Sequence, residues 1–393
     1  MFHKTRLFTP GPTPLLPAAQ FAMAAADLHH RTAEFRALYS RTLDRLKQFI
    51  GTTNDVVVLA SSGTGAMEAA VSNLTSAGDK VLVLTAGKFG ERWTSLAKAF
   101  KCETTVHSAP YGQTFTAADI KAKLTPDTKI VFVQATETST GVRHDLAAIA
   151  GLLKGTDTLL VVDAITGLGT THLDLEGVDV IIGGSQKALM IPPGLAYLAA
   201  SERAWQRMET SNQPRYYFDL RKERKSAAKG ESAYTPSVAL IAAMDAALEY
   251  LAAKGGGDVA VGRRLLVDSA ELCAACMRAG VEAMGLQLFS SRPGAAVTAV
   301  KAPEGISASD IVKGFKAQFG GVLSDGQGEM KGKLFRIAHI GYLDYLDCIA
   351  VIAGLEQVLT KLRPGSFELG VGLKAAQQLY SSTERNAAAG GSR

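Results

Sequence analysis

Residues 161–189, VVDAITGLGTTHLDLEGVDVIIGGSQKAL, carry two reactive side chains at similar points of two apolar runs. Asp163 ends the first run, and Lys187 follows the second run, 178–184, in a loop of small residues. Ligands of open α/β sheets bind beyond the carboxyl ends of the strands. The stretch therefore predicts one of two things. Either it is an ordinary strand–connection–strand unit, or it brings a carboxylate and an amine to one pocket.

Apolar, β-branched runs alternate with helical patterns through the first two thirds of the chain. The runs expected to form strands are 56–60, 80–85, 129–135, 158–164 and 178–184. Such an alternation is typical of a parallel sheet that helices cover on both faces. A Pro-rich, extended arm is expected over residues 1–17. The glycines at 255–257 mark a boundary, so the sequence predicts a large α/β domain over 18–257.

A smaller α+β domain is predicted for residues 258–364. Its pattern is a helix, a strand at 295–303, a helix, a Gly-rich turn, a strand at 333–341 and a final helix. The tail, 365–393, has room for one more helix. It ends in NAAAGGSR, a composition that favours partial disorder.

The composition excludes several classes of protein. The 393 residues are 47% hydrophobic and 20% charged, with a formal net charge of +5. The chain has no dense basic run interleaved with aromatic residues, so binding of nucleic acid is not expected. No window is apolar enough for a membrane span. Cys273 and Cys276 form a CxxC in an alanine-rich helical pattern without nearby histidines, so we expect a buried helix face and no metal. A cytoplasmic location is the default expectation.

The turn SSGTGAME, 61–68, follows a predicted strand and opens a helix. Ser62, Gly63 and Thr64 stand where the first helical N–H groups are unpaired, a position that favours a phosphate. Ser and Thr are also ordinary capping residues. From this turn alone, a helix cap and a phosphate cup both remain open.

Asp163 and Lys187 also have plain interpretations, as a helix cap and as a solvated loop lysine. The combination is more informative than either residue. A phosphate cup, a strand-end carboxylate and a lysine 24 residues later in the chain are the three groups that pyridoxal 5′-phosphate requires. A partly desolvated lysine has a lowered pKa and can attack a carbonyl carbon.

These residues resemble a known family. The chain is similar to the class V aminotransferases of the alanine–glyoxylate and serine–pyruvate group, which are fold type I pyridoxal-phosphate enzymes. The resemblance runs from TPGPTPLLP (9–17) to KLFRIAHIG (333–341) and is most specific in 162–194. It implies an α/β fold with a mostly parallel, seven-stranded sheet and a smaller C-terminal α+β domain.

The resemblance also implies a role for each matching residue. Lys187 would form the internal aldimine with the cofactor, Asp163 would hold its ring nitrogen protonated, and Arg336 would bind the substrate carboxylate. The other matching positions would contact the cofactor: Ser62, Gly63 and Thr64 at its phosphate, Gln186 beside the lysine, Phe89 on the ring face, Thr138 at the ring edge and Thr235 at the phosphate of the neighbouring subunit.

Three positions depart from the family pattern. Phe89 stands where many relatives have tryptophan, so less area is available for stacking. Thr138 occupies a position that is usually serine. Ser232 stands where some relatives have a tyrosine that contacts the cofactor, which leaves that contact in doubt.

The resemblance implies a homodimer whose sites are completed across the subunit interface. The expected reaction moves an amino group from a small L-amino acid, alanine or serine, to a 2-oxo acid, glyoxylate or pyruvate, in two half-reactions. Three alternatives stay open. An aminoethylphosphonate aminotransferase could use the basic segment 221–229, a cysteine desulfurase could use Cys348, and a non-catalytic scaffold subunit would need neither.

Overall fold

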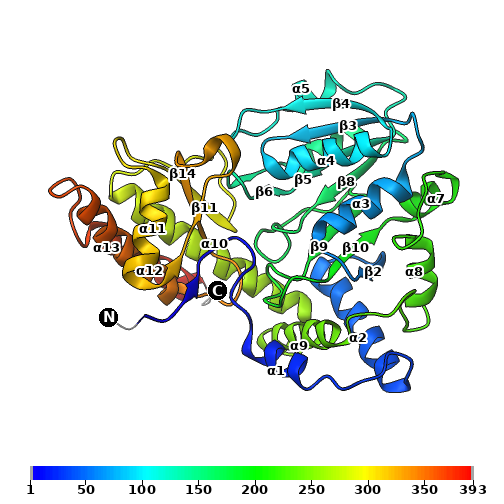
Figure 1. The fold of residues 1–393 in the computed structure, drawn as a ribbon, viewed down its shortest axis with the longest axis horizontal. Helices are drawn as coiled ribbons and strands as arrows, with labels where there is room; N and C mark the ends of the chain where they lie inside the picture. The colour runs from blue at the N-terminus through cyan, green and yellow to red at the C-terminus, as the bar shows by residue number, and fades with distance from the viewer. Residues whose placement is uncertain (1–2, 391–393) are drawn as a thin grey trace.

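The computed structural model describes residues 3–390 and contains a central seven-stranded sheet. The strands occur in the order β2-β10-β9-β8-β5-β3-β4 (Figure 1). Their bounds are β2 (Asp55–Leu59), β3 (Lys80–Thr85), β4 (Glu103–Ser108), β5 (Ile130–Gln134), β8 (Leu159–Asp163), β9 (Val180–Gly184) and β10 (Ala196–Ala200). Strand β10 runs antiparallel to both of its neighbours, and the other pairs are parallel. The predicted mostly parallel sheet is confirmed.

Helices cover both faces of this sheet, because successive strand residues point to opposite sides. Val56 and Val58 join one buried cluster, and Val57 and Leu59 join the other. The helices that contribute to the first cluster are α1 (Pro17–Ala24), α2 (Ala33–Ile50), α5 (Ala117–Lys121), α6 (Leu146–Leu153), α9 (Val238–Lys254) and the first residue of α10 (Val259–Ala283). Those that contribute to the second are α3 (Gly63–Leu74), α4 (Lys88–Ala99), α7 (Glu202–Thr210) and α8 (Leu220–Ala227). Strands buried on both faces explain the near-continuous apolar runs.

The C-terminal part is a three-stranded antiparallel sheet with helices, on the left in Figure 1. Its elements are α10 (Val259–Ala283), β11 (Val297–Lys301), α11 (Ala308–Phe319), β13 (Ser324–Asp325), β14 (Leu334–Ala338) and α12 (Tyr345–Leu362). The turn 255–257 separates α9 from α10, and the domain division drawn there stays a prediction. Helix α13 (Val371–Gly390) packs against α10 and α12. Of the NAAAGGSR end, residues 391–393 lie outside the described residues.

The N-terminal arm joins the two parts. Strand β1 (Arg6–Leu7) pairs in parallel with β12 (Gly321–Val322) of the C-terminal part. The amide of Leu16 then donates to the carbonyl of Met190, in the loop after β9, at 2.9 Å. The arm is therefore fixed at both ends. Within residues 3–390, no helix is long and apolar enough to cross a bilayer.

Candidate active site

The two reactive groups of the opening stretch lie at one edge of the sheet. Asp163 is the last residue of β8, and Lys187 lies in the turn after β9. These strands are parallel neighbours, with Asp163 in register with Ile182. Both side chains line one cavity of about 160 Å³. The other lining residues are Gly11, Ser62, Gly63, Thr64, Phe89, Arg92, Thr136, Thr138, Ile165, Thr166 and Gln186.

The start of α3 forms one wall of this cavity. Ser62 precedes the helix with extended backbone angles, φ −76° and ψ 169°, and its side chain makes no capping hydrogen bond. Gly63 and Thr64 provide the next two N–H groups, which have no intrahelical partner. Both hydroxyl side chains line the cavity. Because the helix start carries partial positive charge, this wall suits an anion.

Asp163 is 6% exposed. Burial raises the pKa of its carboxyl to about 6, the Ile165 N–H lowers it, and Glu137 raises it further. One carboxylate oxygen accepts that N–H at 3.0 Å. The second oxygen can therefore accept from a group in the cavity. A ring N–H⁺ would be held there by charge as well as by hydrogen bonding.

Lys187 is 8% exposed. Burial lowers the pKa of its amine to about 8, Asp163 raises it, and Arg336 lowers it. The amine donates to the backbone carbonyl of Pro10, and the Thr13 hydroxyl donates to the Lys187 carbonyl at 3.2 Å. Gly11 has φ +140°, and a Cβ at this position would overlap the lysine amine. The N-terminal arm thus covers the lysine, a contact that the sequence did not predict.

Two other walls hold predicted cofactor residues. Phe89, in the first turn of α4, faces the cavity, and Thr138 lies between β6 (Thr136–Glu137) and β7 (Val142–Arg143). The Thr138 hydroxyl pairs with that of Thr166 at 2.7 Å. An amide atom of Gln186 and the Thr136 hydroxyl are buried without a hydrogen-bond partner in residues 3–390. These unpaired polar atoms indicate that a polar ligand belongs in the cavity.

Arg336 lies on β14, behind the wall that contains Thr138. It is 3% exposed and does not itself line the cavity. Its two terminal nitrogens donate to the carbonyls of Thr138, at 3.1 Å, and Asp325, at 2.8 Å, while its Nε is buried without a partner in residues 3–390. Burial lowers the pKa of the guanidinium to about 10, whereas Glu137 and Asp325 raise it. The guanidinium therefore remains positively charged near neutral pH.

Glu137 is a buried carboxylate that the sequence analysis missed. One oxygen accepts the N–H groups of Phe89, at 3.1 Å, and Gly90, at 2.9 Å. The other accepts the N–H and the hydroxyl of Ser139, at 3.0 and 2.6 Å. Burial raises the pKa of Glu137, and these donors oppose the shift. The Glu137 carboxyl group faces four donors and no acceptor, which fits its ionised form. The ionised carboxylate connects the start of α4 to the hairpin that contains Thr138.

Arg92 is a second residue that the sequence analysis missed. It follows Phe89 by three residues on α4, and its Nη1 donates to the Thr64 hydroxyl at 2.9 Å. A helical arginine in FGERWTSL has no feature in the sequence that separates it from a surface arginine. The spacing from Phe89 is the one available signal, because residues three apart share a helix face.

Thr235 does not reach the cavity within one chain. It is exposed, and it lines a separate pocket together with Tyr39 and the buried Glu223 of α8. The Ser232 hydroxyl donates to the Tyr234 carbonyl within the same segment. The expected contact of Thr235 with a neighbouring subunit therefore stays a prediction.

The residues behind two alternatives lie away from the cavity. Cys348 is buried in α12 beside Cys273 of α10, and neither lines the cavity. Cys276 is buried on the same face of α10, so the buried helix face predicted for the CxxC is confirmed.

Most of the basic segment, 221–229, belongs to α8, where Arg224 pairs with Asp55 at 2.8 Å. No group of three or more metal-binding side chains occurs in residues 3–390.

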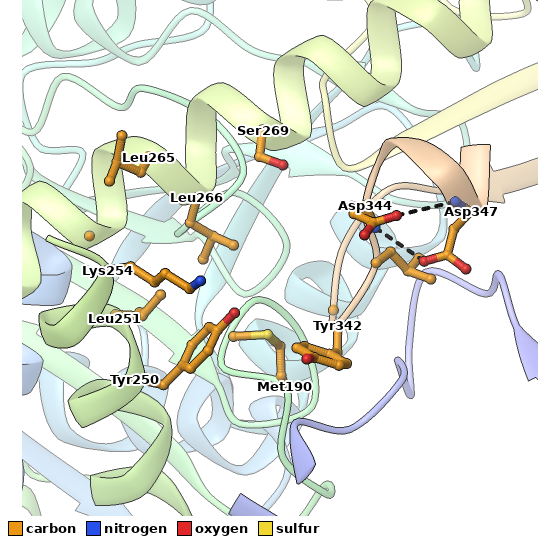
Figure 2. A pocket seen from close by; sticks show the side chains of 13 residues that line it. Met190, Tyr250, Leu251, Lys254, Leu265, Leu266, Ser269, Tyr342, Asp344 and Asp347 are labelled. Carbon is orange, nitrogen blue, oxygen red and sulfur yellow. Dashed lines mark hydrogen bonds between the residues drawn. The ribbon is translucent and has the colours of Figure 1, made fainter. Parts of the chain in front are cut away.

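A different pocket, of about 480 Å³, lies beside Met190, three residues after Lys187 in the chain (Figure 2). Tyr250 and Lys254 from α9, Ser269 from α10 and Tyr342 surround it together with Met190. It is larger than the Lys187 cavity. It contains neither Asp163 nor Lys187, so it offers no comparable set of reactive groups.

The cavity of Lys187 and Asp163 matches pyridoxal phosphate group by group. The start of α3 suits the phosphate, Asp163 suits the ring nitrogen, Phe89 offers an aromatic face, and the amine suits the aldehyde. The unpaired Thr136 hydroxyl would gain an acceptor from the cofactor. The residues present therefore fit this cofactor.

The comparisons with known proteins agree with this fit. Residues 18–270 match the family model "Aminotransferase class-V". A soluble hydrogenase small subunit from Synechococcus sp. is 38% identical over 97% of this chain and 100% of that protein. The L-aspartate–glyoxylate aminotransferase of Paracoccus denitrificans is 33% identical over 98% of each chain.

A solved structure of similar fold is that of an aspartate aminotransferase of subgroup IV from Thermus thermophilus. It has a TM-score of 0.84 and 35% identity over 91% of this chain and 99% of that one. Together with the family match, this likeness confirms the fold type I architecture. The chain therefore belongs to the class V aminotransferase family and is a pyridoxal-phosphate-dependent aminotransferase.

Proposed function

We propose that this enzyme transfers the amino group of a small L-amino acid, alanine or serine, to a small 2-oxo acid, glyoxylate or pyruvate. The observation that carries the proposal is the convergence of Lys187, Asp163 and the start of α3 on one cavity, with Arg336 directly behind the Thr138 wall. The names of relatives support glyoxylate as the acceptor, since the Paracoccus protein is an L-aspartate–glyoxylate aminotransferase.

Asp163 sets the electronic state of the site. Pyridoxal phosphate, when bound, supplies an electron sink for the carbanion that forms at the substrate Cα. The Asp163 carboxylate holds a proton on the ring nitrogen, which keeps that sink effective. The negative charge of Asp163 is costly to bury, and the positive charge of the held proton offsets that cost.

Lys187 moves the proton. Once substrate has displaced it, its neutral amine takes the proton from the substrate Cα as a general base and later returns it as a general acid. Its pKa of about 8 leaves a minor neutral fraction at pH 7, far larger than that of a solvated lysine, and this fraction grows as the pH rises through 8. The Pro10 carbonyl, which accepts from this amine, orients it within the cavity.

Arg336 selects the substrate by its carboxylate. A guanidinium binds a carboxylate through two parallel hydrogen bonds, which fixes the direction of the Cα–H bond. The carbonyls of Thr138 and Asp325 now occupy its terminal nitrogens, and its Nε has no partner in residues 3–390. A substrate carboxylate in the cavity reaches the guanidinium by displacing the Thr138 carbonyl, and this exchange of a neutral acceptor for a charged one favours substrate.

We also propose that two copies of the chain complete the site. Thr235 is exposed and cannot reach the cavity of its own chain. Phe21 of α1 is an apolar side chain that is 76% exposed, and Tyr216 is 74% exposed near the Thr235 segment. A symmetric dimer that covers these side chains would bring Thr235 to the neighbouring cavity.

The first test is the visible absorption spectrum of the purified enzyme. L-Alanine or L-serine should bleach the band of the lysine-bound cofactor, and glyoxylate should restore it. L-Aspartate is the control donor, because both aspartate-named proteins are similar to this chain. A response to aspartate alone would contradict the small-donor proposal while leaving transamination in place.

The alternatives give different outcomes in the same experiment. Bleaching by aminoethylphosphonate alone would favour a phosphonate donor. Release of sulfide and alanine from cysteine would favour a desulfurase. A protein that takes up pyridoxal phosphate but responds to no amine would favour the scaffold role, which the hydrogenase-subunit name of one relative suggests.

A further inference from the structure

Arg92 brings an unassigned positive charge into the cofactor cavity. It lines the cavity from α4, and among the described residues Arg92 and Lys187 are its two cationic lining side chains. The amine of Lys187 already has a role toward the aldehyde. Arg92 makes no ion pair with a carboxylate in residues 3–390, and the hydrogen bond it donates goes to a neutral hydroxyl. A half-buried cation without a counterion favours a bound anion.

The contacts of Arg92 direct that charge to one end of the cavity. Its Nη1 donates to the hydroxyl of Thr64, in the first turn of α3, at 2.9 Å. Its guanidinium carbon lies 5.0 Å from the centre of the Phe89 ring. The guanidinium thus lies between the anion-binding helix start and the ring that stacks on the cofactor. Its field also lowers the pKa of Asp163.

The residues assigned so far to the phosphate of the cofactor include no cation. The helix start, the Ser62 and Thr64 hydroxyls and Gln186 are neutral donors, whereas the phosphate of the cofactor carries close to two negative charges. An arginine fork matches phosphate geometry and adds a second hydrogen bond where an ammonium adds one. The nitrogens of Arg92 that do not bond to Thr64 are available for that contact.

We propose that Arg92 binds the phosphate of pyridoxal phosphate, as the cationic member of the cup formed by Ser62, Gly63 and Thr64. This inference rests on the cofactor and not on the substrates proposed above. It makes Arg92 a binding residue for the phosphate, held over the Phe89 ring by a cation–π contact.

The test compares two ligands that differ only in the phosphate. Apo-enzyme is titrated with pyridoxal 5′-phosphate and with pyridoxal, and the dissociation constant of each is read from the visible band of the lysine-bound form. Arg92→Gln should weaken binding of the phosphate form about 10- to 100-fold, because a charge-assisted hydrogen bond is lost. Binding of pyridoxal should change less than about twofold, since pyridoxal offers no phosphate oxygen to this side chain.

Two further variants sharpen the result. Arg92→Lys keeps the charge without the fork, so its affinity for the phosphate form should fall between those of Arg92→Gln and the unmodified enzyme. Lys98→Gln removes one charge from the exposed face of the same helix and should change neither constant. Inorganic phosphate should compete with pyridoxal phosphate in the unmodified enzyme and much less in Arg92→Gln.

Three outcomes would overturn the inference. An equal loss of affinity for both ligands would mean that Arg92 acts through Phe89 or through the fold. Unchanged affinity for both would remove Arg92 from the cup. Unchanged cofactor affinity with a raised KM for the amino donor would assign the guanidinium to substrate. None of these depends on which donor and acceptor the enzyme uses.

Discussion

At the level of single residues, Asp163 and Lys187 are shaped by one conflict. Burial disfavours the charge of each, and the opposite charge of the other favours it. The result is a carboxyl with a pKa of about 6 and an amine with a pKa of about 8, and both values lie closer to pH 7 than the ordinary values of these groups. Such shifts are typical of catalytic acids and bases. Near neutral pH the carboxyl of Asp163 is therefore mostly ionised, and the amine of Lys187 is close enough to its pKa to exchange a proton.

The pKa of Lys187 predicts how fast apo-enzyme takes up the cofactor. Below a pH of about 8 the amine is mostly protonated and cannot attack an aldehyde. The rate of cofactor uptake should therefore rise with pH and level off above about 8, as stopped-flow absorbance would record. In Asp163→Asn the negative charge that favours the protonated amine is gone, so the midpoint of the rise in uptake rate should move to lower pH. An inflection near the usual lysine value of 10.5 would contradict the shift.

Glu137 provides a second residue-level prediction. Glu137→Gln replaces an oxygen that accepts two donors with an NH₂ group that cannot accept. Each buried donor left without a partner costs about 1–3 kcal/mol. Urea unfolding of the apo-enzyme should show a loss of that order or more. Ser139→Ala removes one donor and should cost about 0.5–1.5 kcal/mol. Equal stabilities of the two variants would show that the carboxylate is not the centre of this network.

Arg92 and Glu137 are the residues near the site that could not be predicted from the sequence. Lys187 and Asp163 could be predicted because strand ends in a parallel sheet meet at one edge. Glu137 and Arg92 act through partners far away in sequence, namely the α4 amides and Thr64. Nothing local distinguishes a buried glutamate before a Thr-rich turn from an exposed one. Only the packed structure shows which donors it faces.

At the level of elements, α9 and α10 make one of the closest contacts of the chain. A Cβ on Gly262 would overlap the backbone carbonyl of Leu251, which has no flexible end to move aside. Gly262→Ala should therefore force the helices apart and cost about 1–3 kcal/mol or more in thermal or urea unfolding. Gly151→Ala, on α6 with nothing within 4 Å, is the matched control and should stabilise by up to about 1 kcal/mol. A stable Gly262→Ala protein would mean that the crossing is looser than the structure has it.

The strands differ in how well their sequences identify them. The five predicted runs match β2, β3, β5, β8 and β9 to within one or two residues at each end, because strands buried on both faces are apolar throughout. Strand β4, ETTVHS, lies at the sheet edge and is largely polar. Strand β10, AYLAA, is alanine-rich and antiparallel. Neither has the composition of a buried parallel strand, so the total of seven came from the family resemblance.

At the level of the whole molecule, the N-terminal arm connects the parts that form the site. It pairs with β12 of the C-terminal part, and its Pro10 carbonyl accepts from Lys187. The carbonyls that hold Arg336 belong to both parts, Thr138 to the large one and Asp325 to the small one. Prolines in the sequence predicted an extended arm, but extended backbone has no preferred partner. These contacts follow from tertiary packing alone.

The proposed dimer makes a prediction that a single chain cannot satisfy. Lys187→Ala removes the amine from its own cavity, and Thr235→Asp would place a carboxylate against the phosphate of the partner's cavity, where like charges repel. Each variant alone should be nearly inactive. If the two are refolded together, each mixed dimer contains one cavity with both defects and one with neither. Random pairing makes about half of the dimers mixed, so about a quarter of all cavities should be intact.

The same mixture also distinguishes a shared site from a site within one chain. If Thr235 acts only within its own chain, every cavity of a mixed dimer keeps one defect, and no activity returns on mixing. Thr235 is exposed in the single chain, so the substitution should leave the fold of each copy intact, which circular dichroism can verify. Lys187→Ala mixed with an inactive Asp163→Asn chain is the control, because both residues line the same cavity of one chain. That mixture should remain inactive, and recovery in the first mixture alone would place Thr235 in the partner's site.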